Sequence, residues 1–580
     1  MLSSRSTKIQ VYCKSMKTHL VPVCTIPAEI SPQALPLGAA SIVAAINKSF
    51  VDEPLAPDVS VEARLVSIPP EFHLSLEEKA QAIAAQLLKL QPAALCFSLF
   101  VWNRTVLARV AAIIQEKLPE IPLIAGGPEV TAGAADTDPF HYLVCGEGDE
   151  SVPALLRQLL QKGDSVADAS KADSNLPPRK IFSPRANQEN LPSPYLTGVL
   201  KPTEYQNGAL WELARGCPFK CAYCYESKGE KTVAYFPMER IRQELDFFAK
   251  QKVSQIFVLD PTYNAKKERA VEILKLIRQK APNTFFHFEC RAELLNPELV
   301  AAFSRISCSL QIGLQSARPE VLKLVARSIN RKEFAGKIAL LNNAGIIFGF
   351  DLIYGLPGDN LAGFKESIDY AISLYPNSLE LFRLSVLPGT TLFDQKQELG
   401  LVAPSTPPYL VESTPQFSAK DLDKAEALAR ATSYFYSRGR AVSWFHALLK
   451  PLRCSPSVFF TRFVDFLATE NITIPAIQDD CSHKEVELLQ LKFIQNQYSS
   501  PKLQSLLPAA TDLIKLNGAF SRAYADGERT NLSLSFHPDD LLSPYSQDLA
   551  FFCQHAQKTK LHIIVQPSKG GAEWRQAKKV

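Results

Sequence analysis

Three cysteines within eight residues are the strongest chemical signal in this sequence. They lie in the run Arg215-Gly216-Cys217-Pro218-Phe219-Lys220-Cys221-Ala222-Tyr223-Cys224-Tyr225. Cysteine thiolates are the usual ligands of iron–sulfur clusters. Three thiolates on a four-iron cube leave one iron open, and an open coordination site is what a catalytic metal centre needs. The spacing therefore predicts a catalytic [4Fe-4S] cluster held by Cys217, Cys221 and Cys224.

A zinc site is the competing interpretation of this triplet. Zinc would require a fourth Cys or His at short spacing, or a second cysteine pair. The nearest downstream candidates are the distant His287 and Cys290, so ligand number and spacing favour the cluster. The other nine cysteines stand alone in mostly apolar surroundings, which is typical of buried small hydrophobic residues; they are Cys13, Cys24, Cys96, Cys145, Cys290, Cys308, Cys454, Cys481 and Cys553.

Regularly spaced strand patterns surround the triplet and must position it. Six of them, with helical patterns between them, predict a partial (β/α)6 barrel whose chemistry lies at the carboxyl ends of its strands. Because the triplet directly follows the first strand, we expect it to form a loop at that end. The strand candidates are Leu210–Ala214, Gln255–Asp260, Phe285–Arg291, Ser309–Leu314, Ile347–Ile353 and Ser378–Val386. The helix candidates are Met238–Lys250, Ala265–Lys280, Pro297–Ser304, Pro319–Arg327, Arg331–Asn343 and Leu361–Leu374.

The triplet and the barrel pattern resemble the radical S-adenosylmethionine (SAM) superfamily, whose signature is CxxxCxxC with an aromatic residue, here Tyr223, before the last cysteine. The resemblance implies that the open iron binds the amino and carboxylate groups of SAM. It implies that an electron from the cluster then cleaves SAM to methionine and a 5′-deoxyadenosyl radical, with an external donor of the flavodoxin or ferredoxin type. It also implies that SAM is bound at the strand ends by Asp260, Pro261, Thr262, Glu289, Arg291, Gln315, Ser316 and Ile353.

These strand-end residues also have structural interpretations. Asp260 is a candidate helix cap. Glu289 and Arg291 lie two apart on one strand face and are a candidate ion pair. The Asp260-Pro261-Thr262 sequence departs from the Gly-Gly-Glu form that the superfamily uses at this strand. Taken jointly, polar residues at the same end of successive strands favour a binding site.

The first 160 residues alternate short apolar strands with amphipathic helices. This pattern predicts an α/β fold with a doubly wound, Rossmann-like parallel sheet, which binds ligands beyond the carboxyl ends of its strands. The strand candidates are Leu20–Thr25, Val61–Ile68, Ala94–Leu99, Pro122–Ala125 and Tyr142–Cys145, and the clearest helix candidates are Ser75–Gln91 and Thr105–Leu118.

Glycine-containing loops follow these strands, and glycine permits close approach of the backbone to a ligand. Taken alone, they are equally consistent with turns that bind nothing. As a set they resemble the cobalamin-binding domain found upstream of many radical SAM enzymes. The resemblance implies that cobalamin is bound by Pro36, Leu37, Gly38, Ser98, Leu99, Trp102, Asn103, Gly126, Gly127, Pro128, Glu129, Gly146, Glu147 and Gly148.

The DxHxxG motif that supplies a histidine to cobalt in other cobalamin domains is absent here. The sequence has no His between His19 and His73. We therefore expect the lower face of cobalt to lack a protein nitrogen and to be covered by Phe100, Val101 or Trp102. A position for Trp102 in the hydrophobic core is the alternative.

Length and composition set the domain organisation. A chain of 580 residues is too long for one hydrophobic core. We expect a cobalamin-binding domain at 1–160, a Pro- and Ser-rich linker at 161–204, the radical SAM barrel at 205–400, and a mainly helical domain at 401–580 whose last residues, about 566–580, are frayed. A net charge of +4 and the absence of a long apolar run predict neither a nucleic-acid nor a membrane partner, and indicate a soluble, cytoplasmic protein.

This combination of domains resembles the class B radical SAM methyltransferases. It implies methylation of an unactivated carbon of a small molecule or peptide, with one SAM as methyl donor and a second as radical source. A cobalamin-dependent radical rearrangement or cyclisation without methyl transfer, and a non-catalytic cobalamin or redox carrier, are the alternatives. The substrate and the oligomeric state are left open.

Overall fold

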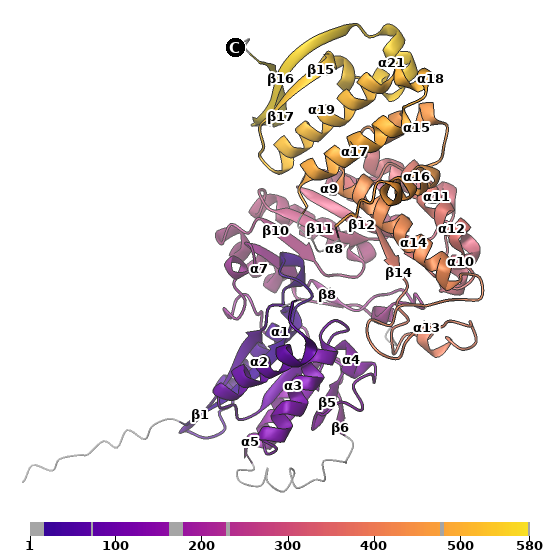
Figure 1. Cartoon of the computed structure of the whole chain (residues 1–580). Coiled ribbons are helices and arrows are strands. Elements are labelled where there is room, and N and C mark those ends of the chain that lie inside the picture. The colour runs from indigo at the N-terminus through magenta and orange to yellow at the C-terminus, as the bar shows by residue number, and fades with distance from the viewer. Residues whose placement is uncertain (1–16, 71–72, 162–177, 228–231, 476–480, 578–580) are drawn as a thin grey trace, which may run out of the picture.

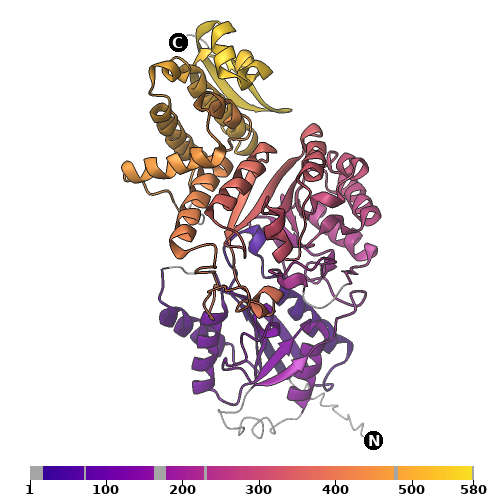
Figure 2. The ribbon, with the colours of Figure 1, turned by 90° about the vertical axis from the view of Figure 1, so that its right-hand side faces the viewer.

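The computed structural model describes residues 17–70, 73–161, 178–227, 232–475 and 481–577, so that Cys13 lies outside the described residues. Three regions follow one another along the molecule, with the barrel between an amino-terminal α/β domain and a carboxyl-terminal region (Figures 1 and 2). Among the described helices, none has the length and apolar character needed to cross a membrane.

The amino-terminal domain is a six-stranded parallel sheet in the order β2-β1-β3-β4-β5-β6. Its helices cover both faces, because α2 and α3 bury one apolar cluster and α1 and α5 bury another. The predicted doubly wound sheet is therefore confirmed. Its elements are β1 (Lys17–Thr25), α1 (Leu37–Asp52), β2 (Val59–Ser67), α2 (Leu76–Lys89), β3 (Leu95–Ser98), α3 (Arg104–Lys117), β4 (Leu123–Gly126), α4 (Pro128–Thr131), β5 (Tyr142–Cys145), α5 (Gly148–Gln161) and β6 (Arg179–Phe182).

The sixth strand was not anticipated. β6 lies within 161–204, where we expected a linker. It pairs in parallel with β5, in a register that runs from the Tyr142–Arg179 pair to the Cys145–Phe182 pair. Its exposed position at the sheet edge explains the weak apolar signal in its sequence.

The second sheet is the partial barrel, with six parallel strands in the order β14-β13-β12-β11-β10-β7. All six predicted strands and their intervening helices are present. They are β7 (Gly208–Trp211), α7 (Met238–Lys250), β10 (Gln255–Val258), α8 (Lys267–Lys280), β11 (Phe285–Cys290), α9 (Pro297–Phe303), β12 (Cys308–Gln315), α10 (Pro319–Leu324), α11 (Arg331–Asn343), β13 (Ile347–Tyr354), α12 (Leu361–Ser373) and β14 (Ser378–Arg383). A short antiparallel pair, β8 (Ala214–Arg215) and β9 (Ala234–Tyr235), brackets the loop that contains the cysteine triplet.

The carboxyl-terminal region is mainly helical, as predicted. Its helices are α13 (Thr391–Asp394), α14 (Ala419–Thr432), the π-helix η7 (Ser433–Arg438), α15 (Phe445–Leu452), α16 (Pro456–Thr469), α17 (His483–Gln497), α18 (Pro501–Gln504), α19 (Leu507–Ala525), α20 (Pro538–Leu542) and α21 (Leu549–His555). Phe435, Phe445 and Phe459 are buried with edge-to-face ring contacts, so these aromatic side chains belong to the core.

One expectation for this region is wrong. Instead of fraying, the described part of 566–580 belongs to an antiparallel sheet of β15 (Thr530–Phe536), β16 (Lys558–Ser568) and β17 (Gly571–Gln576). The strands alternate polar and apolar residues, and the apolar side chains Ile563 and Val565 are buried. Packing of this sheet face on α19 stabilises a segment that is too polar overall to suggest a strand.

Candidate functional site

The cysteine triplet lies in the loop that leaves the first barrel strand, as predicted. Asp260, at the end of β10, anchors the start of this loop: its Oδ1 accepts hydrogen bonds from the backbone N–H groups of Leu213 (2.8 Å) and Ala214 (3.0 Å). Burial raises the pKa of Asp260 to about 7, although these two bonds oppose the rise. Gly216 follows with φ +88°, and a Cβ there would lie 2.9 Å from Nη2 of Arg185. A side chain at this position would therefore strain the backbone and displace the Arg185 guanidinium.

The three thiols differ in burial and have polar neighbours. Cys221 is 7% exposed, whereas Cys217 and Cys224 are half-buried. The Arg291 and Arg327 guanidiniums each approach the Cys221 sulfur at 3.8 Å, and Thr262 Oγ1 lies 3.6 Å from the Cys217 sulfur. Donors around a thiolate favour its charged form. The residues present thus fit a thiolate-ligated metal centre.

Within the described residues, no three His, Cys, Asp or Glu side chains converge closely enough to bind one metal ion. This is compatible with a cluster, because each corner iron of a cube takes its own thiolate and the sulfurs are held apart by the cube. Burial raises the pKa of the Cys224 thiol to about 11, so binding of iron there would displace a proton.

Arg327 is a residue that the sequence analysis missed. It lies in the loop after α10, and its Nη1 donates to the Tyr223 hydroxyl (3.1 Å) while its Nη2 donates to the Gly313 carbonyl (2.7 Å). It thereby connects the aromatic residue of the cysteine motif to β12. Nothing local marks this arginine in the sequence, because its partners are about 100 residues upstream or on another strand.

Some of the predicted strand-end residues contact the cysteine loop, and others have partners elsewhere. Thr262 and Arg291 contact the cysteine loop, Glu289 lines the inner face of the sheet, and Ile353 packs partly buried at the end of β13. Ser316 is fully buried, and its hydroxyl accepts a hydrogen bond from the backbone N–H of Arg318. Pro261 separates Asp260 from Thr262, and its carbonyl accepts a hydrogen bond from the Thr262 hydroxyl.

Gln315 has a distinct environment. It is 8% exposed, adopts φ +67°, and its Oε1 has no hydrogen-bond partner among the described residues. A buried, unsatisfied carboxamide oxygen is energetically unfavourable. The side chain therefore fits a role as an acceptor for a ligand that is bound at the ends of the barrel strands.

The amino-terminal sheet carries a cavity of about 320 Å³ at the carboxyl ends of its strands. Predicted cobalamin-binding residues that line it are Gly38, Ser98, Gly126, Gly127, Pro128, Gly146, Glu147 and Gly148. Gly38 has no atom within 4 Å of a Cβ position, and Gly126 meets only a carbonyl at 3.7 Å, so both leave open space for a ligand. Gly127 instead relieves backbone crowding, because its Cβ would lie 2.6 Å from the Leu99 carbonyl.

A second, more apolar cavity of about 420 Å³ lies between the first loop of this sheet and the barrel. Pro36, Leu37 and Trp102 line it on one side, and Leu210 and Leu259 of the barrel line it on the other. Trp102 is 50% exposed and stacks on Phe100 at 4.6 Å between ring centroids, while its Nε1 donates to the Ile26 carbonyl. The alternative of a core position for Trp102 is therefore wrong.

Three further residues of the predicted cobalamin set lie outside both cavities. Leu99 is fully buried in the core. The Asn103 side chain accepts from the Phe100 N–H and donates to the Ile26 carbonyl, which shapes the loop that contains Trp102. Glu129 is buried and accepts a hydrogen bond from the Tyr409 hydroxyl at 2.6 Å, which joins the sheet to the segment after the barrel.

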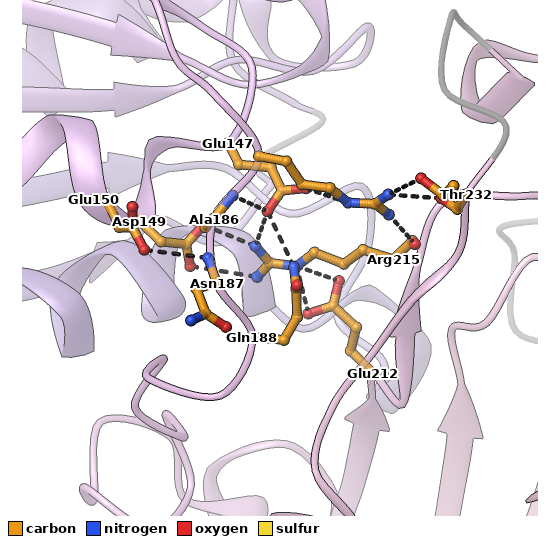
Figure 3. Close-up of polar contacts among 10 residues, drawn as sticks. Glu147, Asp149, Glu150, Ala186, Asn187, Gln188, Glu212, Arg215 and Thr232 are labelled. Carbon is orange, nitrogen blue, oxygen red and sulfur yellow. Dashed lines mark hydrogen bonds and ion pairs between the residues drawn. The ribbon is translucent and has the colours of Figure 1, made fainter.

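An ionic network around Arg215 joins the amino-terminal domain to the strand end that precedes the cysteine loop (Figure 3). Arg215, two residues before Cys217, donates to Glu147 (2.9 Å) and Asp149 (2.8 Å) of the amino-terminal domain and to Glu212 (3.1 Å) of its own strand end. The side chains of Glu147, Asp149, Glu212 and Arg215 also line the cavity. A ligand in the cavity would therefore contact the group that supports the cysteine loop.

A second arginine reinforces this junction. Arg185, from the segment after β6, donates to the Arg215 carbonyl and to the Thr232 carbonyl, and its Nε lies 3.7 Å from Glu147 Oε1. Burial raises the pKa of Glu212, and the neighbouring Arg215 counteracts this rise. The network therefore connects the amino-terminal domain, the barrel and the segment after β6.

Comparison with known proteins assigns the barrel. Residues 211–371 match the family model of the Radical SAM superfamily, which confirms the predicted radical SAM domain. The chain is 25% identical over 338 residues to the cobalamin-dependent radical SAM methyltransferase TokK of Streptomyces tokunonensis, covering 52% of this chain and 48% of TokK. It is 32% identical over 192 residues to the 2-(S-pantetheinyl)-carbapenam-3-carboxylate methyltransferase of Streptantibioticus cattleyicolor, covering 30% of this chain and 28% of that protein. The matches thus span about half of these relatives or less.

Two solved structures share the fold. The radical SAM methyltransferase TsrM of Kitasatospora setae, with cobalamin and a [4Fe-4S] cluster bound, is 15% identical with a TM-score of 0.52 over 67% of this chain and 81% of TsrM. The cobalamin-dependent radical SAM enzyme OxsB, with aqua-cobalamin and SAM bound, is 12% identical with a TM-score of 0.50 over 84% of this chain and 80% of OxsB. At these identities the likeness concerns the fold, and it confirms the predicted succession of a parallel sheet, a partial barrel and a helical region.

Proposed function

Because residues 211–371 form a radical SAM domain, we propose that this chain is a cobalamin-dependent radical SAM methyltransferase. When bound, the cluster and SAM supply a 5′-deoxyadenosyl radical, and cobalamin supplies a transferable methyl group. The substrate class is a small molecule or a peptide with an unactivated carbon, and the electron donor is an external protein of the flavodoxin or ferredoxin type.

Cys217, Cys221 and Cys224 hold the cluster. Arg291 and Arg327 stabilise the Cys221 thiolate, since each guanidinium lies 3.8 Å from its sulfur. Arg291 is itself fixed by its stacking over the Phe219 ring at 3.7 Å and by Glu293. These contacts come from β11 and from the loop after α10, so that the barrel orients the cysteine loop.

SAM binds at the ends of the barrel strands. Gln315 offers its unpartnered Oε1 to the cofactor as an acceptor, and Thr262 bounds the site beside Cys217. Asp260 acts indirectly, because its Oδ1 is occupied by two backbone N–H groups of the loop. We therefore assign Asp260 to positioning of the cysteine loop.

Cobalamin binds in the two cavities of the amino-terminal domain. Gly38, Ser98 and Gly126 leave open space along the sheet for its nucleotide tail. The stacked pair of Phe100 and Trp102 offers an apolar surface beside the barrel. Neither cavity is lined by a histidine, so these residues provide no imidazole for cobalt.

The observation that carries this proposal is that the cavity of the amino-terminal sheet is lined by residues that directly precede the cysteine loop. Arg215 and Glu212 of the barrel line the cavity of the amino-terminal sheet, and Arg215 is two residues from the cluster ligand Cys217. This closeness in the chain supports binding of the two cofactors on either side of Arg215, where proximity would favour transfer between the groups that they contribute.

The test is the stoichiometry of SAM consumption. The reconstituted, reduced enzyme is incubated with SAM that carries a deuterated methyl group and with an extract that contains the substrate. Each turnover should yield one S-adenosylhomocysteine and one 5′-deoxyadenosine with methionine, and the labelled methyl group should identify the product. The C217A/C221A/C224A variant is the matched control and should give neither nucleoside.

Two other outcomes contradict the proposal. Formation of 5′-deoxyadenosine and an altered product without S-adenosylhomocysteine would identify a radical rearrangement or cyclisation. Absence of SAM cleavage by an enzyme that carries the reduced cluster would identify a non-catalytic carrier.

A further inference from the structure

The post-barrel segment, residues 384–411, follows the last barrel strand and contacts both proposed cofactor regions. A short antiparallel pairing attaches it to the end of β14. In this pairing the Val386 N–H donates to the Tyr409 carbonyl (2.9 Å), and the Val411 N–H donates to the Leu384 carbonyl (2.8 Å). The segment reaches the amino-terminal domain in both views of the molecule (Figures 1 and 2).

One contact of this segment is with the cysteine loop. The segment includes α13, whose Leu392 N–H donates to the Ala222 carbonyl at 2.8 Å. The N–H of Ala222 donates to the Val325 carbonyl at 3.0 Å. Ala222 lies between Cys221 and Cys224, the proposed cluster ligands. Both backbone groups of this residue are therefore bonded to elements outside the loop, so a change in the cysteine loop on cluster binding would displace α13.

The other contact is made by the side chain of Tyr409, which is fully buried. Its hydroxyl donates to Glu129 Oε2 at 2.6 Å and accepts from Arg104 Nη1 at 3.2 Å. Arg104 is itself held by two hydrogen bonds to Asp138, of 2.8 and 3.1 Å. Tyr409 adopts φ +58°, which is uncommon for a residue with a side chain and persists where surrounding contacts impose it. The post-barrel segment is therefore fixed to the amino-terminal domain at this residue.

Glu129 belongs to α4, which lies between two glycine loops of the sheet cavity. Gly126 and Gly127 directly precede α4 and line the cavity. At the end of α4 the Thr131 hydroxyl donates to the Gly127 carbonyl (3.1 Å) and accepts from the Gly146 N–H (2.9 Å). Gly146 also lines the cavity. The position of α4 therefore sets the position of both glycine loops.

The Tyr409 hydroxyl is the closest donor to the Glu129 carboxylate among the described residues. Glu129 is 5% exposed, and the guanidinium of Arg104 lies farther away, at 3.6 Å. Without the hydroxyl, this buried carboxylate would keep only the more distant contact, which is unfavourable for a charged group. The hydrogen bond therefore favours one position of α4 over others.

We propose that Tyr409 is a positioning residue for cobalamin: its hydroxyl fixes α4, and the post-barrel segment connects α4 to the cysteine loop. The inference rests on the proposed function, because it assumes that the cluster binds at the cysteine triplet and cobalamin in the sheet cavity. Two ligands that favour the same arrangement of a shared element strengthen the binding of one another by equal factors. Cluster-loaded protein should therefore bind cobalamin more tightly than iron-free protein.

The experiment measures the affinity of the full chain for hydroxocobalamin by equilibrium dialysis. The protein is used in its iron-free form and in its cluster-loaded, oxidised form, both without SAM. In the parent, the cluster should raise the affinity about fivefold or more, the lower end of typical coupling between sites. Tyr409→Phe should lower the affinity of the cluster-loaded form about tenfold, the factor expected from one hydrogen bond to a charged group. The ratio of the two affinities should fall to about one, because the connection to α4 is lost.

Tyr436→Phe and Tyr498→Phe are the matched controls. Both side chains are fully buried, as Tyr409 is. Their hydroxyls donate to the backbone carbonyls of Pro376 (2.7 Å) and Leu448 (2.8 Å), which line neither cavity of the amino-terminal domain. These variants should lose thermal stability but keep the affinity ratio of the parent.

Two further measurements connect the effect to α4. Hydrogen exchange in peptides that contain residues 126–131 should increase in Tyr409→Phe without any cofactor and stay unchanged in the controls. Glu129→Ala removes the acceptor, so the addition of Tyr409→Phe to it should cause no further loss of affinity, whereas independent residues would give additive losses. If Glu129→Ala fails to fold, Tyr409→Phe and its two controls decide the question.

Three results would overturn the inference. They are an affinity ratio near one in the parent, a parental ratio in Tyr409→Phe, and equal losses of affinity in Tyr409→Phe and the two controls, which would assign Tyr409 to packing alone. Failure of the proposed function is distinguishable from these. A parent that binds no hydroxocobalamin in either form would refute cobalamin binding itself, and the role of Tyr409 with it.

Discussion

The substitution of Arg215 by Met tests the junction between the two cofactor regions. Met keeps an unbranched apolar chain, and so retains contact with the Phe236 ring, which lies 5.5 Å from the Arg215 guanidinium. It removes the charge and all three ion pairs to Glu147, Asp149 and Glu212. Arg215→Lys is the companion variant, because it keeps the charge but cannot reproduce the planar fork of donors.

The expected magnitude follows from burial. Arg215 is 16% exposed, and its partners Asp149, Glu147 and Glu212 are 7%, 24% and 25% exposed. Removing one partner of a buried ion pair lowers the free energy of unfolding by about 3–5 kcal/mol, since the other charge stays buried and unpaired. Because two of the three carboxylates are about a quarter exposed, we expect Arg215→Met to lower the free energy of unfolding by about 3 kcal/mol, the lower end of this range. Arg215→Lys should lose about 1–2 kcal/mol, the value of imperfect hydrogen bonds to charged groups.

The effect has a predictable dependence on pH. Burial raises the pKa of Glu212, and Arg215 opposes this rise. Without Arg215 the folded-state pKa of Glu212 rises further above its unfolded value, so its charged form destabilises the fold at high pH. Protonation removes that charge as the pH falls. The difference in stability between Arg215→Met and the parent should therefore be smaller at acidic than at alkaline pH.

Thermal unfolding and hydrogen exchange measure the effect. Exchange should increase in peptides that contain residues 146–150 and 212–217, and iron retention should fall because the cysteine loop loses its support. Arg64→Met is the control, since Arg64 and Glu62 form an exposed pair within the amino-terminal domain. If Arg215→Met melts and exchanges like Arg64→Met at every pH, the network does not support the junction and the reasoning is refuted.

Two further predictions concern the metal centres. The C217A/C221A/C224A variant should bind no iron, whereas C454A/C481A/C553A should retain about four irons per chain, as one cubane implies; about eight irons in the parent would show a second cluster. Bound cob(II)alamin should give an electron paramagnetic resonance spectrum without nitrogen superhyperfine splitting, because neither cavity is lined by histidine; a split spectrum would mean that an imidazole or the base of the cofactor coordinates cobalt.

The sequence alone determined the elements that rest on local periodicity. Strands and helices of both α/β sheets were predicted because apolar residues repeat with periods of two and 3.6 and glycine loops separate them. The cysteine triplet was equally visible, since all three ligands lie on one loop. The cavity-lining residues Gly38, Ser98 and Gly126 followed from their position after strands of a parallel sheet.

Tertiary structure decided the groups that act across long separations. Arg327 reaches the cysteine loop from about 100 residues downstream, and Arg215 pairs with Asp149 across the domain boundary. Asp260, Asn103 and Glu129 have residue types suited to a site, yet backbone and hydroxyl partners from elsewhere occupy them. Which polar residue remains available to a ligand depends on contacts that no local pattern records.

The inner face of the barrel sheet and the last sheet illustrate the same limit. Glu289, Asp351 and Glu380 are separated by up to 91 residues, and only the parallel register brings them onto one face. The strands β15 to β17 are polar overall and become stable by packing on α19. Local periodicity specifies that a strand can form, whereas its pairing partner, its register and its burial are set by tertiary packing.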